Sequence, residues 1–136
     1  MKRYLVGALV GGASLFVLGF LIYVVLMPSP QFANGPAAGT ACRAKPDLPP
    51  IILAELLFGF LLTRALTKSG AIAGVGSAAK TGALIGGVIA LGYSLLILGT
   101  TQLTTPQGVI YEAITWAIRW AIAGAVLAKV VGPEKS

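Results

Sequence analysis

Four long apolar segments dominate the pattern of this chain, and shorter stretches that carry most of its prolines and charges separate them. A transmembrane helix needs about 20 mostly apolar residues, because each residue rises about 1.5 Å through a hydrocarbon core about 30 Å thick. We therefore predict membrane-spanning helices at about residues 4–27, 50–67, 81–99 and 108–131. The chain is expected to be all-α, a single transmembrane domain over residues 1–136 that folds as an integral membrane four-helix bundle.

The connections between these segments differ in composition. Residues 28–49 are rich in Pro, Gly and Ala, which predicts an irregular loop between the first two helices. Residues 68–80 are small and weakly apolar, so they form either a loop or an early extension of the third helix. A cleaved signal peptide is the weaker alternative for the first segment, because its apolar run exceeds the roughly 7–15 residues of a signal h-region.

Composition supports a membrane protein. The chain is 57% hydrophobic and only 10% charged, whereas a soluble domain carries about 25% charged residues. Its net charge of +6 could suggest nucleic-acid binding, but the basic residues stand singly at the ends of apolar runs instead of clustering on one face. We therefore expect the lipid bilayer as the partner of this chain, and no nucleic acid.

The basic residues also predict orientation, because Lys and Arg flanking membrane helices remain in the cytoplasm. Four crossings would place seven of them on one side: Lys2, Arg3, Arg64, Lys68, Lys80, Lys129 and Lys135. Only Arg43 and Lys45 would lie on the other side. The bias indicates a multi-pass protein with both termini in the cytoplasm and the Pro/Gly-rich loop outside. The inner surface should attract anionic lipid head groups.

Residue types argue against an enzyme. The chain has one cysteine, Cys42, and no histidine, so the usual zinc sites and His-dependent nucleophile triads are missing. The glycines at Gly74 and Gly76 resemble a dinucleotide fingerprint, but no strand precedes them and the last glycine is absent. We expect no enzymatic activity, no metal and no cofactor.

Small residues recur at helix-packing intervals in three of the four segments. Gly7 and Gly11 form a GxxxG pair in the first helix, and Gly82 and Gly86 form another in the third. The fourth segment carries a similar row at Ala117, Ala121 and Gly124. Such rows let helix backbones approach closely in lipid. Packing within one bundle is the favoured interpretation, and homodimerisation through one row is the alternative.

Three charged residues inside the predicted spans, Glu55, Glu112 and Arg119, lie away from the cytoplasmic ends of their helices. Glu55 and Glu112 should lie about 6–8 Å below the outer surface, and Arg119 about 10 Å deeper than Glu112 on the same helix face. A lone Arg near mid-membrane costs about 2.5–3.5 kcal/mol or more, which favours pairing with Glu55 or Glu112.

Intramembrane charges have several interpretations. A Glu55–Arg119 pair that fixes helix register is favoured over a polar site for an ion, a proton or a small anion. Snorkelling without a specific partner is the third alternative. Glu112 is also consistent with an interfacial carboxylate near the N-terminus of its helix.

The stretch Val10 to Tyr23, with its glycines and its final Leu-Ile-Tyr, is similar to the first helix of small bacterial membrane proteins of unknown function. Gly82 to Tyr93 and Ala121 to Val131 resemble the later helices of that group. The resemblance implies a four-helix protein of the bacterial inner membrane, and it implies no reaction or ligand.

Two functions remain as predictions. The first is a structural or accessory role, through helix packing in a homo-oligomer or a larger membrane complex. The alternative is a small ion or solute channel or transporter that uses Glu55 and Arg119.

Overall fold

The computed structural model describes residues 1–22, 35 and 47–132. Within these ranges the chain forms four α-helices and one short 3-10 helix: α1 (Lys2–Phe20), α3 (Leu48–Ser69), η3 (Ala71–Ala73), α4 (Val75–Thr100) and α5 (Pro106–Val130). All four α-helices are long and apolar enough to cross a membrane. The prediction of an all-α chain with four helices of membrane-spanning length is confirmed.

The turn between α3 and α4 shows why the third helix begins earlier than predicted. Gly70 ends α3 in a left-handed conformation, with φ of 77°, which glycine adopts without steric cost. The chain then makes one 3-10 turn at η3, and α4 starts at Val75. Residues 75–80 are therefore helical, as in the second of the two alternatives for this stretch.

Both α3 and α5 carry proline in their first turn. Proline is tolerated in the first turn of a helix, where its missing N–H has no partner in any case. Thr105 caps α5, because its hydroxyl oxygen accepts a 3.0 Å hydrogen bond from the Gly108 N–H. The sequence predicts a first helix that runs to Met27; α1 itself ends at Phe20, and Leu21 and Ile22 follow in π-helical conformation. Residues 23–27 lie outside the described part of the chain.

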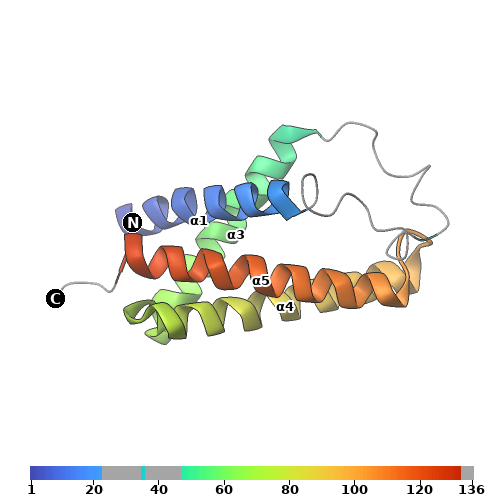
Figure 1. Ribbon diagram of the computed structural model, residues 1–136. Coiled ribbons are helices and arrows are strands. Elements are labelled where there is room, and N and C mark those ends of the chain that lie inside the picture. Colours follow the sequence, from blue (N-terminus) through green and yellow to red (C-terminus); the bar gives the residue numbers. More distant parts are fainter. Residues whose placement is uncertain (23–34, 36–46, 133–136) are drawn as a thin grey trace.

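The helices divide into a parallel group and one oblique member. Figure 1 shows α1, α4 and α5 lying side by side, while α3 crosses them obliquely and its N-terminal end rises away from α4. The most extensive contact joins α4 to α5, and the next joins α1 to α3. Because α3 meets α4 and α5 over only small areas, the arrangement departs from the regular four-helix bundle that we expected.

The outer surface is apolar on every helix. Large hydrophobic side chains are exposed on α1, α3, α4 and α5, among them Leu9, Leu57, Leu84 and Ile110. The interior core is small and includes Leu15, Leu62, Trp120 and Leu127. A water-soluble protein rarely exposes apolar surface on this scale, and a lipid-facing one has no need to cover it. The structure thus supports a multi-pass membrane protein.

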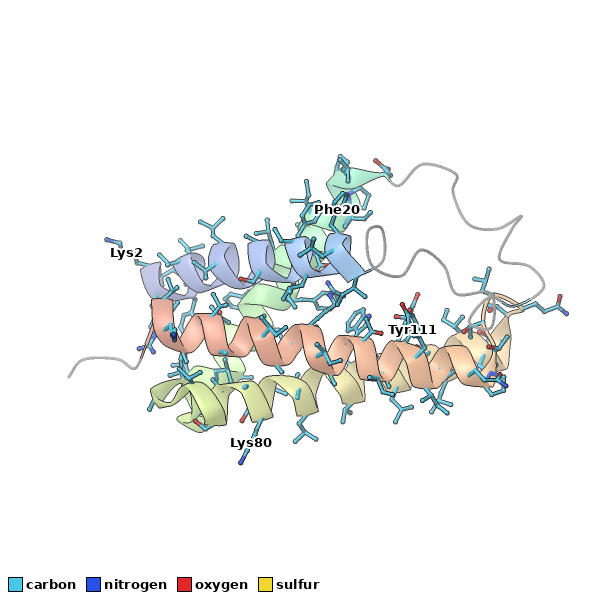
Figure 2. All side chains as sticks on the ribbon, in the orientation of Figure 1. Lys2, Phe20, Lys80 and Tyr111 are labelled. Carbon is cyan, nitrogen blue, oxygen red and sulfur yellow. The ribbon has the colours of Figure 1, made fainter. Side chains whose placement is uncertain are left out.

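The start of α1, the end of α5 and most of the described basic residues lie at one end of the molecule. The Arg3 guanidinium at the start of α1 donates a hydrogen bond to the Gly132 carbonyl just after α5. The α3–α4 turn lies at the same end (Figure 1). Figure 2 shows Lys2 and Lys80 extending away from the helices here. The start of α1 and the end of α5 therefore lie on the same side of the helices.

Candidate functional site

The first close contact between helix backbones is that of α1 with α3. A Cβ atom added at Gly11 would lie 3.1 Å from the Cα of Gly59, and one at Gly12 would lie 3.0 Å from the carbonyl oxygen of Glu55. Gly7 faces the side chain of Thr63, one turn nearer the N-terminus of α1. The two backbones thus touch along α1, and this contact fixes how far Glu55 reaches into the molecule.

A second close contact joins α4 to α5. Gly82 lies against the backbone carbonyl of Trp120, and Gly86 lies against its indole ring. Gly124 of α5 faces the Ala78 carbonyl in return. Trp120 is fully buried by this packing, which sets the rotation of α5 about its axis. Since Arg119 precedes Trp120, its side chain is directed toward α1 and α3.

Arg119 and Glu55 meet where α1, α3 and α5 converge. Nη2 of Arg119 lies 2.7 Å from Oε1 of Glu55 and donates a 2.8 Å hydrogen bond to the carbonyl oxygen of Leu15. Arg119 is only 3% exposed. One guanidinium nitrogen therefore binds two other helices at once. We call the group formed by Leu15, Glu55 and Arg119 the three-helix junction.

Two neighbours shape the pocket for the guanidinium. Gly19 of α1 packs against the guanidinium, and a Cβ atom added at Gly19 would lie 3.0 Å from Nη2 of Arg119. Cζ of Arg119 lies 5.4 Å from the centre of the Trp116 ring, a distance typical of a cation–π contact. Glycine on one side and an aromatic ring on the other let the charged group fit between helices without contacting lipid.

The aromatic side chains extend this packing into α3. Phe58 contacts both tryptophans, at centroid distances of 5.4 Å to Trp116 and 5.6 Å to Trp120. The two indole rings are nearly parallel, with an angle of 16° between them. Phe58 lies one turn after Glu55, so the same face of α3 carries the carboxylate and the ring that packs beside Arg119.

The ion pair is asymmetric at the carboxylate. Oε1 of Glu55 receives the Arg119 hydrogen bond, whereas Oε2 is buried and has no hydrogen-bond partner among the described residues. A buried acceptor without a partner costs free energy. Oε2 is thus the atom at which a further hydrogen-bond donor, such as water, would lower the free energy of the junction.

Glu112 occupies a separate position. It lies on α5, about 10 Å along the helix axis from Arg119, and it is half-buried. The salt bridge of the junction joins Arg119 to Glu55. The structure therefore brings together Glu55 and Arg119 of the three predicted intramembrane charges, and it places Glu112 two turns nearer the N-terminus of α5.

The small residues predicted to mediate packing lie between helices of this chain. Gly7 and Gly11 face α3, while Gly82 and Gly86 face α5. Gly87, next to Gly86, approaches Ala117, and Gly82 approaches the backbone nitrogen of Ala121. These rows are therefore occupied by intramolecular contacts. A homodimer formed through any of these rows would require that helix to separate from its partner in the same chain.

Two features of the site departed from sequence reasoning. Trp120 is fully buried between α4 and α5, which was not predicted from the sequence. The Leu15 carbonyl and Gly19 were not anticipated as parts of the junction. The signal for Gly19 was present in principle, since a glycine in an otherwise bulky part of α1 marks a close approach.

No group of three or more His, Cys, Asp or Glu side chains that could hold a metal ion occurs within residues 1–22 and 47–132. Comparison of the chain with protein-family models, with curated proteins and with solved structures gave no match.

Proposed function

We propose that this chain is a structural or accessory protein of the bacterial inner membrane, and that it acts as a homo-oligomer or within a larger membrane complex. The observation that carries this proposal is the division between interior and surface. Arg119 and the packing glycines lie in contacts between helices, and the outward faces of all four helices are apolar apart from basic residues near one end, such as Arg64, Lys68 and Lys80. Such a molecule offers packing surface to lipid and to other membrane helices.

The orientation proposed here places both termini in the cytoplasm. It is supported by six basic residues, which lie at the end that holds the chain termini: Lys2, Arg3, Arg64, Lys68, Lys80 and Lys129. Basic flanks are retained on the cytoplasmic side. The single cysteine, Cys42, lies in the loop predicted to face outward, so a membrane-impermeant maleimide should label it in intact spheroplasts. Labelling only after the membrane is opened would contradict this orientation.

The accessory role is tested by crosslinking in native membranes followed by mass spectrometry of the complex in nanodiscs. We expect a discrete oligomer or a discrete complex with another membrane protein. Because the inward glycines are occupied, Gly92→Leu and Gly99→Leu probe outward faces of α4, where nothing lies within 4 Å of an added Cβ. A chain that stays monomeric at every lipid-to-protein ratio and captures no partner would refute the proposal.

A second candidate is a small channel or transporter, and the unpartnered Oε2 of Glu55 favours it. Intramembrane carboxylates and arginines mark ion and proton pathways in many membrane proteins. Flux of protons or small ions into proteoliposomes should then fall in Glu55→Gln and in Arg119→Leu. The control is Gly92→Ala, which alters neither the charges nor the helix contacts. Flux equal to that of protein-free vesicles would exclude this function.

A further inference from the structure

One face of α3 points away from the rest of the protein and changes character along its length. Six exposed residues form this face, at spacings of three or four: Leu53, Leu57, Phe60, Leu61, Arg64 and Lys68. At about 100° per residue they fall within a single sector of the helix. The buried residues of α3, which include Gly59, Leu62 and Leu66, lie on the opposite side. We call the six exposed residues the α3 stripe.

Among the described residues, no salt bridge neutralises the basic end of the α3 stripe. Arg64 and Lys68 are four residues apart, about 6 Å along the axis, so their like charges repel each other. No acidic residue follows Glu55 on α3, and Glu55 itself is engaged with Arg119 at the junction. An anion bound between the two cations would remove this repulsion.

The remainder of the α3 stripe is apolar, and its length along the helix is close to that of a phospholipid acyl chain in one leaflet. From Arg64 back to Leu53 the helix rises about 16 Å, which matches one leaflet of a hydrocarbon core about 30 Å thick. Arg64 also lies about 8 Å before the end of α3 at Ser69. An anion there would lie beside the exposed apolar surface of α3.

Helix α1 borders the α3 stripe on one side. Tyr4 of α1 packs edge-on against Phe60, with ring centroids 6.0 Å apart. Tyrosine is enriched at the head-group level of membrane proteins, because its ring is apolar and its hydroxyl is polar. The two rings thus form a ridge beside Leu57 and Leu61, close to the level at which the cations begin.

We propose that the α3 stripe is a binding site for one anionic phospholipid of the leaflet that faces the basic end of the protein. Arg64 and Lys68 bind its phosphate, and one acyl chain lies along Leu61, Leu57 and Leu53. The site rests on the membrane location of the four helices. It does not depend on an oligomer or on transport, so a failure of either proposed function leaves it standing.

The test uses the full chain in nanodiscs of phosphatidylcholine with a small fraction of phosphatidylglycerol, and native mass spectrometry measures how much anionic lipid each protein retains. We expect the wild-type chain to retain one phosphatidylglycerol preferentially. Arg64→Gln combined with Lys68→Gln should reduce retention about thirtyfold, because each cation near an anionic lipid surface contributes about fivefold. Both side chains are exposed, so the variant should fold.

The matched control removes the same charge from the same end of the protein. Lys80→Gln combined with Lys129→Gln changes two exposed cations on α4 and α5, and retention should stay within about threefold of wild type. Equal loss in both double variants would overturn the proposal in favour of general attraction to charge. Two further arms test the source of the phosphate: inorganic phosphate and phosphatidylglycerol with six-carbon chains. If either displaced the long-chain lipid at equal concentration, the acyl-chain part of the site would be refuted.

Discussion

The α4–α5 hairpin and the three-helix junction are held together by different interactions. In the hairpin, glycines of α4 receive Trp120, and the two helices are joined by only the short segment at residues 101–105. At the junction, α1 and α3 are separated by residues 21–47, and a buried guanidinium links both of them to α5. The α4–α5 hairpin, with its short connection, is held by close steric packing. The junction, whose first two helices are separated by a longer stretch of sequence, has in addition a directional polar contact that selects one arrangement.

The two kinds of contact also differ in the free-energy cost of disrupting them. Shape-based packing in lipid lacks a hydrophobic driving force, so it depends on close backbone approach and is lost when that approach is blocked. A buried ion pair contributes little net free energy when intact, but removing one partner costs about 3–5 kcal/mol, because the other charge remains buried. Variants in the two regions should therefore differ in size of effect and in their response to a second substitution.

The largest effect is expected from Arg119→Leu, which leaves the Glu55 carboxylate buried without its cation. The free energy of unfolding, measured by titration with a denaturing detergent, should fall by about 3–5 kcal/mol. Glu55→Leu combined with Arg119→Leu should recover most of the loss, because neither charge remains. A double variant as unstable as the single one would show that Arg119 acts through its other contacts, the Leu15 carbonyl and Trp116.

The next effect concerns the hairpin. In Gly86→Ala the new Cβ would lie 2.6 Å from the Cβ of Trp120 and 2.8 Å from its Cδ1. Trp120 is fully buried and cannot move aside, so overpacking should lower the free energy of unfolding by about 1–3 kcal/mol.

The matched control for the hairpin is Gly92→Ala on the same helix, where the added methyl meets open space. It should be neutral or slightly stabilising, since alanine favours helix more than glycine does. Equal destabilisation by the two substitutions would show that the glycines act through helix propensity and not through contact with α5.

The smallest effect links α1 to the junction. Gly19→Ala places a methyl group 3.0 Å from Nη2 of Arg119, which displaces the guanidinium by a few tenths of an ångström. We expect a loss of about 1 kcal/mol in the wild-type background and none in the Arg119→Leu background, within the usual range of couplings between contacting residues. A double-mutant cycle in the same detergent titration measures this coupling, and additive losses would place Gly19 outside the junction.

Much of the helical structure could be predicted because apolar length is a local property of the sequence. The four helices, the break at the α3–α4 turn and the start of α5 at its proline all depend on residues within a few positions. The oblique course of α3 could not be predicted, because it results from Gly11, Gly12 and Gly59, which are far apart in the chain. Glycine spacing indicates that a helix is approached closely, but it does not identify the partner helix.

The pairing of Glu55 with Arg119 was the favoured prediction, because the cost of a lone intramembrane charge limits the alternatives. The backbone acceptor at Leu15 and the opening at Gly19 were beyond sequence reasoning. Every residue has a carbonyl group, so nothing in the residue types indicates which one a guanidinium will reach. Only the rotation of α5, set by Trp120 in its contact with Gly86, decides that.

The order of the junction residues along the chain has a consequence for biosynthesis. Leu15 and Glu55 leave the ribosome before Arg119, so the first two spans enter the membrane while their cation has yet to be translated. Until α5 inserts, the Glu55 carboxylate lacks the cation that it binds in the folded chain. The junction between α1, α3 and α5 is therefore completed only when the last span arrives.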